Sequence, residues 1–205
     1  MKIMTKDNAV LMQMARESLR GKWNTVVPIF LIYIIITAAL QGVSEVFPLA
    51  GLISLILSGP IALGISIFSL NIAGDNDLKA EQLFEGFKNF GTSVVAYLLM
   101  VIFILLWSIL LIIPGIIAAL SYSMTFFIIA EDSSIDAVEA LKKSKEMMDG
   151  HKWKYFCLSL RFIGWALICI LTLGIGFLWL LPYIQVTNVK FYEDIKEANL
   201  SYKSV

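Results

Sequence analysis

Long uncharged runs separated by short charged segments dominate the pattern of this chain. The longest run, residues 89–130, contains no charged side chain. One membrane-spanning helix needs roughly 20 residues, so this run is long enough for two. The tripeptide Ile113-Pro114-Gly115 lies near its middle. Proline lacks the backbone N–H that a helix uses as a hydrogen-bond donor, and glycine permits a sharp turn. The run therefore predicts a tight hairpin of two transmembrane helices.

Two other runs predict three further spans. Residues 23–44 are uncharged and form the first expected span. Residues 162–189 are also uncharged, and Leu173-Gly174-Ile175-Gly176 divides them into a fifth and a sixth span.

The uncharged run 46–74 is long for one span and short for two. Gly59-Pro60 interrupts it, which favours an outer interfacial or re-entrant segment over 47–58, followed by the second span over 60–74. The alternative is one long, tilted helix.

Charged segments between the runs contain three amphipathic helices, at 5–20, 78–89 and 134–149. Apolar residues recur in them at helical spacing, and Arg16 and Arg20 share one face of the first. We expect these helices to lie in the interface of the inner leaflet. Docking of a cytoplasmic partner on their apolar faces is the alternative.

The fold class that follows is an all-α membrane protein with six transmembrane helices arranged as three hairpins, plus cytoplasmic amphipathic helices. The chain is read as one integral membrane domain over 1–205. Its order of elements suggests three units, at 5–75, 78–132 and 134–194, each ending in acidic residues. Pseudo-threefold packing of the units is the corresponding hypothesis.

Composition and charge agree with a membrane location. Charged residues make up 16% of the chain and mean hydropathy is +0.81, whereas soluble domains carry about 25% charged residues. All 16 Lys and Arg residues lie in the segments expected on one side, so the positive-inside rule places both termini in the cytoplasm. The net charge of zero gives no indication of a nucleic-acid partner.

Several local motifs resemble those of one known family. They are residues 86–91 (GFKNFG), 107–116 (WSILLIIPGI), 121–124 (SYSM), 140–144 (ALKKS), 148–153 (MDGHKW) and 191–194 (FYED). Together they resemble an uncharacterised bacterial multi-pass membrane family, domain of unknown function 975, over nearly the whole chain. The resemblance implies six spans in a bacterial plasma membrane and supplies no activity. The layout is also similar to membrane domains appended to some glycerophosphodiester phosphodiesterases, which implies lipid handling.

Polar side chains inside the expected spans are the first candidate site. Ser121 and Thr125 share a helix face, as do Gln185 and Asn188. Since such groups are unfavourable in hydrocarbon, they either line a polar cavity or join helices by hydrogen bonds. Arg161 lies inside the fifth apolar segment and is expected to snorkel or to pair with an acid on the sixth span.

Acidic residues at the inner ends of the spans are the second candidate site. They are Asp75, Glu131, Asp132, Glu193 and Asp194. Helices packed around an axis would bring them into a ring that attracts cations. Solvated helix ends paired with nearby lysines are the alternative. Glu193 and Asp194 are also the expected partners of Arg161.

No pattern of catalytic or metal-binding residues emerges. His151 is the only histidine and has no ligand-type neighbours at suitable spacing. Cys157 and Cys169 are separated by about 18 Å along a helix, too far for a disulfide. We therefore expect no enzyme activity, cofactor or metal.

The leading function is binding or moving an amphipathic ligand, such as a lipid or a peptide, within the bilayer. The alternative is a membrane interaction, immunity or scaffold protein that acts through a membrane protein partner. A continuous polar cavity would favour the first, and a single stoichiometric partner would favour the second.

Overall fold

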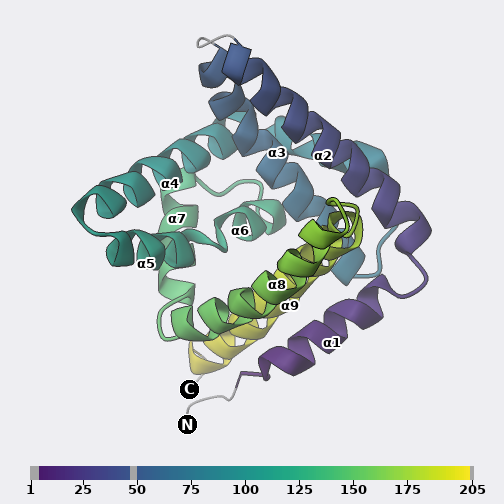
Figure 1. Cartoon of the computed structure of the whole chain (residues 1–205). Helices are drawn as coiled ribbons and strands as arrows, with labels where there is room; N and C mark the ends of the chain where they lie inside the picture. Colours follow the sequence, from purple (N-terminus) through teal and green to yellow (C-terminus); the bar gives the residue numbers. More distant parts are fainter. Residues whose placement is uncertain (1–4, 47–49, 204–205) are drawn as a thin grey trace.

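The computed structural model describes residues 5–46 and 50–203, and this part of the chain is helical with short connections (Figure 1). Its helices are α1 (Asn8–Leu19), α2 (Trp23–Val46), α3 (Ala50–Ala73), the 3₁₀-helix η1 (Ala80–Asn89), α4 (Phe90–Leu110), α5 (Ile112–Tyr122), α6 (Thr125–Glu131), α7 (Ala137–Met147), α8 (Lys152–Leu171) and α9 (Phe177–Lys203).

The helices are apolar enough for a multi-pass membrane protein. Within the described residues, five segments have the length and composition needed to cross a membrane. They are Trp23–Val43, Gly51–Ala73, Ala80–Leu110, Ile112–Glu131 and Lys152–Leu171. Large apolar side chains on them face outward, as lipid-facing helices require; Ile109 and Leu171 are 83% and 84% exposed.

The helices can be grouped into three successive sets, although the division of the chain into three units stays a prediction. A short helix, a long helix and a returning helix occur in turn as α1, α2 and α3, then as η1, α4 and the pair α5–α6, then as α7, α8 and α9. Each returning segment contains a proline: Pro60, Pro114 or Pro182. Superposition of the units, and hence the pseudo-threefold hypothesis, stays a prediction.

The expected break at Gly59-Pro60 is wrong. Pro60 lies inside the continuous helix α3, so the single-helix alternative applies to residues 50–58, while residues 47–49 lie outside the described residues. A membrane helix tolerates proline where neighbouring groups satisfy the freed backbone atoms. The Ser58 hydroxyl donates to the Ser54 carbonyl (2.7 Å), a bond separate from the Ile56 carbonyl whose usual helical donor would be residue 60.

The turn between α4 and α5 lies earlier than the sequence indicates. Leu111 is the extended residue (φ −161°, ψ 147°), and Pro114 belongs to the first turn of α5. A proline there loses no helical hydrogen bond, because the first N–H groups of a helix have no intrahelical acceptor. Gly115 instead allows close packing: a Cβ on it would lie 2.1 Å from the Ser108 hydroxyl oxygen. Figure 1 shows α5 folding back beside α4.

Helix α9 holds together the helices that form the candidate site. It packs against α1, α2, α3 and α8, and Figure 1 shows α8 and α9 side by side. Helix α1 buries Leu11, Ala15 and Leu19 completely. Near the C-terminal end of α9, Phe191 and Tyr192 are buried, so this helix carries much of the core.

Glycines bring η1 and α3 into backbone contact. The sequence predicts an amphipathic helix over 78–89, and the structure forms it as the tighter 3₁₀-helix η1. A Cβ on Gly64 would lie 1.9 Å from the Leu83 carbonyl oxygen, and one on Gly86 would lie 1.9 Å from the Pro60 carbonyl oxygen. Both positions are therefore closed to any larger side chain without movement of the backbone.

Replacing either glycine should destabilise the fold. We expect Gly64→Ala and Gly86→Ala each to lower the free energy of unfolding by about 1–3 kcal/mol, the usual range for overpacking. Unfolding in mixed detergent micelles measures this. Gly91→Ala is the matched control, because nothing lies within 4 Å of a Cβ built there. Equal stability of all three variants would contradict the close packing.

Candidate functional site

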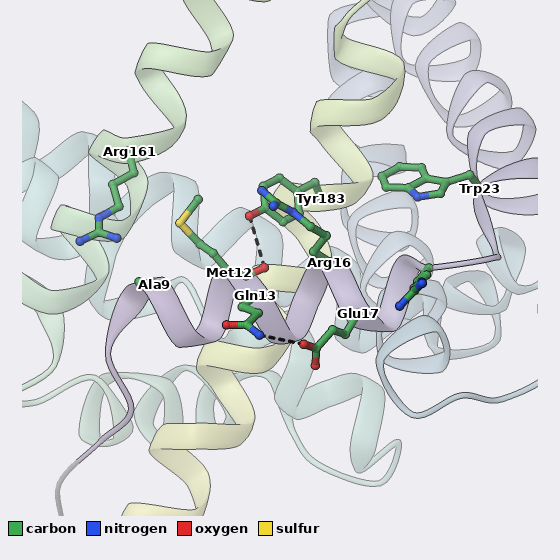
Figure 2. A pocket seen from close by; sticks show the side chains of 9 residues that line it. Ala9, Met12, Gln13, Arg16, Glu17, Trp23, Arg161 and Tyr183 are labelled. Carbon is green, nitrogen blue, oxygen red and sulfur yellow. Dashed lines mark hydrogen bonds between the residues drawn. The ribbon is translucent and has the colours of Figure 1, made fainter.

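A groove lies between α1 and α8, with α9 as its floor (Figure 2). Its volume is about 740 Å³. The two wall helices meet at one end, where the Asn8 side-chain amide donates to the Lys154 carbonyl (3.0 Å). Figure 2 shows Arg161 near the Ala9 end, Arg16 beside Tyr183 in the middle, and Trp23 at the far end.

Helix α1 places its polar residues in the groove because its apolar face is committed elsewhere. The buried face packs on α9. Met12, Arg16 and Arg20 follow one another at four-residue spacing beside that face, and all line the groove. Gly21 then adopts a left-handed conformation (φ +79°), which ends the helix before Trp23 begins α2.

Tyr183 of α9 forms the floor and joins the two walls. Its hydroxyl donates to the Met12 carbonyl of α1 (3.2 Å), and its ring packs edge-on against Phe162 of α8 with centroids 5.5 Å apart. The Arg16 guanidinium carbon lies 5.8 Å from the Tyr183 ring centroid, within range of a cation–π interaction. The middle of the groove is thus held in place by contacts from three helices.

The groove is strongly cationic. The sequence contains three arginines, Arg16, Arg20 and Arg161, and all of them line this groove. Within the described residues, none of the three forms an ion pair with a carboxylate. The one acid that lines the groove, Glu17, instead accepts a hydrogen bond from the Gln13 side chain (2.9 Å). Guanidinium groups suit planar, bidentate recognition of anionic oxygens.

An apolar cavity of about 240 Å³ continues from the cationic groove. The two share Arg16, Trp23 and Tyr183. On α8, Arg161 is followed at four-residue intervals by Trp165 and Cys169, so this wall extends about 12 Å along the helix. Trp179 and Leu180 of α9 complete the apolar part. The combined site is cationic at one end and apolar at the other.

The polar residues predicted within the spans lie elsewhere, apart from Arg161. Ser121 and Thr125 are buried, and their hydroxyls donate to carbonyls of their own segment, those of Ile117 (2.7 Å) and Tyr122 (2.8 Å). Ser144 of α7 donates to the Ser121 carbonyl (2.8 Å), which joins these two elements.

Gln185 and Asn188 are half-buried on α9 and do not line the groove. A polar cavity formed by Ser121, Thr125, Gln185 and Asn188 stays a prediction.

The expected ion pair of Arg161 is absent from the described contacts. Asp194 instead accepts from the Lys154 ammonium (2.8 Å) and from the backbone N–H of Lys6 (3.0 Å), while Glu193 pairs with Lys190 (3.0 Å). On α8, Lys154 lies about two helical turns before Arg161. Lys154 is therefore the basic residue of α8 that lies beside Asp194 and pairs with it.

The other acidic candidates also have separate partners. The ammonium of Lys22 donates to Asp75 (2.7 Å) and holds the pKa of that carboxyl below its usual value. The Ser134 hydroxyl and backbone N–H lower the pKa of Asp132 in the same way. Glu131 pairs with Lys196 and accepts from the hydroxyl of Tyr192 (2.8 Å). Burial and this carboxylate raise the pKa of Tyr192.

No three His, Cys, Asp or Glu side chains of the described residues are grouped as metal ligands would be. A ring of acids that attracts cations therefore stays a prediction.

These features define the class as a helical, multi-pass membrane protein. Comparison with known families adds the particular one: residues 1–114 and 108–199 match the model of a protein of unknown function, DUF975. The chain belongs to this family. No curated protein and no solved structure matches it.

Sequence reasoning missed most of the groove. Arg16 and Arg20 were recognised as one face of a helix, but nothing local indicates that Arg161 lies across from them. Trp165 and Trp179 are inconspicuous within apolar runs. The available signal is the scarcity of arginine, since only three occur among 16 basic residues.

Loss of the Asp194 carboxylate should loosen the inner end of the groove. Asp194 is 5% exposed and its partner Lys154 is 20% exposed, so Asp194→Asn leaves a largely buried ammonium without a counter-ion. We expect a loss of about 3 kcal/mol in the free energy of unfolding. Asp77→Asn, which breaks an exposed pair with Lys79, should change it by less than about 1 kcal/mol. Equal losses, measured in mixed micelles, would contradict the structural role of Asp194.

Proposed function

We propose that this protein binds an amphipathic ligand within the bilayer, in the groove between α1 and α8. The observation that carries this proposal is the continuity of a cationic cavity with an apolar one through Arg16, Trp23 and Tyr183. A ligand with an anionic head and an apolar tail would match both parts. Tryptophan side chains suit such a position, because their amphipathic rings favour the membrane interface.

The proposal includes a six-span arrangement in a bacterial plasma membrane, with α9 as the sixth span and both termini in the cytoplasm. The distribution of Lys and Arg supports this orientation. The hydrogen bond from the Lys6 backbone to Asp194 supports placing the two ends on one side, because it joins the segment before α1 to the C-terminal half of α9.

The ligand is bound, and moved where transfer occurs, without chemical change. The polar groups of the groove are arginines, a tyrosine, a glutamine and one glutamate, and this set suits recognition of an anion. The alternative function is that of an interaction or scaffold protein. The exposed rings of Phe84, Phe87 and Phe90 on and beside η1 favour it, since they lie in a row with centroids 6.4 Å apart at each step.

Removing the apolar end should release the ligand. Trp165→Ala combined with Trp179→Ala deletes two large ring surfaces, and we expect retention of a co-purified lipid to fall by about tenfold or more. Native mass spectrometry after incubation with a total polar lipid extract measures the bound fraction. The matched control combines Trp107→Ala with Trp153→Ala, two exposed tryptophans outside the groove. Equal adducts in both double variants would contradict the proposal.

A further inference from the structure

Building on the proposed function, we propose that the ligand is an anionic phospholipid, with its head group in the groove that the three arginines line and one acyl chain along Trp165, Cys169 and Trp179. The groove selects this lipid against zwitterionic phospholipids by its charge.

The use of arginine rather than lysine in the groove indicates an anionic head group that contains phosphate. Lysines supply every ion pair of the described residues, while the arginines of the chain are gathered in the groove. Guanidinium presents a planar fork of donors that matches two phosphate oxygens at once, and it is less strongly hydrated than ammonium. Three guanidinium groups face a single carboxylate, Glu17, so the excess of positive charge favours an anion.

The arrangement of the arginines fits a phosphodiester with further head-group atoms. Arg16 and Arg20 are one turn apart on α1, and Arg161 lies on the opposite wall near Ala9 (Figure 2). The space between the walls therefore extends along α1 and exceeds what a single small anion needs. A zwitterionic lipid would place its own cation in the same cavity, against the arginines.

The apolar arm distinguishes a lipid from a soluble phosphate compound. It adjoins the arginines, extends about 6 Å along α8 from Trp165 to Cys169, and is lined by three of the five tryptophans of the chain. Trp165 and Trp179 are 51% and 48% exposed, so the arm is open at its side. An acyl chain can thus enter laterally from the bilayer. A free phosphate would leave this surface uncovered.

Quenching of tryptophan fluorescence tests the assignment directly. In the full-length variant Trp107→Phe/Trp153→Phe, the remaining tryptophans, Trp23, Trp165 and Trp179, all line the site. The variant is reconstituted in phosphatidylcholine vesicles doped with phosphatidylglycerol brominated on its acyl chains, or with brominated phosphatidylcholine at the same fraction. We expect about tenfold or greater preference for the brominated anionic lipid, because basic residues near the membrane surface attract anionic head groups.

Charge variants separate the groove from general surface attraction. In the same background, Arg16→Gln/Arg20→Gln/Arg161→Gln should abolish the preference. Lys88→Gln/Lys142→Gln/Lys145→Gln removes three positive charges outside the groove and should leave the preference intact. Arg161→Lys, which keeps the charge and loses the fork, should weaken the preference partially. Thermal midpoints in detergent identify any variant that fails to fold, and Arg161→Lys then carries the test.

Each other outcome overturns a defined part of the assignment. Both brominated lipids could quench equally, and more than their fraction in the vesicles accounts for. That result would contradict selection of the anionic lipid and would still support binding of an amphiphile. Quenching by neither, together with no lipid adduct in native mass spectrometry, overturns both proposals. Displacement of the brominated lipid by glycerol phosphate or inorganic phosphate at comparable affinity assigns the site to a soluble anion. Displacement by an acidic amphipathic peptide assigns it to a peptide.

Discussion

The carboxylate of Asp194 fixes the separation of the two groove walls. It accepts a hydrogen bond from the Lys6 backbone, just before α1, and another from the ammonium of Lys154 in the first turn of α8. Charge-assisted hydrogen bonds of this kind are short and directional. Because Asp194 belongs to α9, it ties both walls to the floor at one end. Tyr183, about three turns earlier on the same helix, repeats this arrangement in the middle of the groove. The geometry of the site is therefore a property of α9.

The membrane character of the chain could be predicted from the sequence, but the continuity of its helices could not. Uncharged runs long enough to cross a bilayer are explicit in the pattern, and the described residues contain five segments of the right length and composition. Pro60 and Pro114 both suggested breaks, and neither forms one. A proline interrupts a helix only where its missing donor is needed and unreplaced. That depends on its register within the helix and on the groups packed around it, which a run of apolar letters does not specify.

The residues of the site could also be predicted only in part. Arg161 stood out correctly as a charge within an apolar segment, but its expected partners are bound by lysines. Which charged residues form ion pairs depends on which helix ends lie together. Tertiary packing decides this, and the local sequence does not. The same reason explains why Arg16 and Arg20 were recognised as a helix face without a role. Only the placement of α8 across α1 brings the third arginine to them.

The separation of lysine from arginine is the more informative feature of the charge pattern. A membrane protein needs positive charge on its cytoplasmic side to set its orientation, and lysine and arginine serve that need equally. Orientation alone therefore gives no reason to collect the arginines at one place. In the described residues, lysines form the ion pairs that hold helix ends together, and the arginines line one groove without carboxylate partners. The property that distinguishes the two side chains is the planar fork of donors, which serves recognition of anionic oxygens. The groove, rather than the topology of the chain, accounts for where the arginines are found.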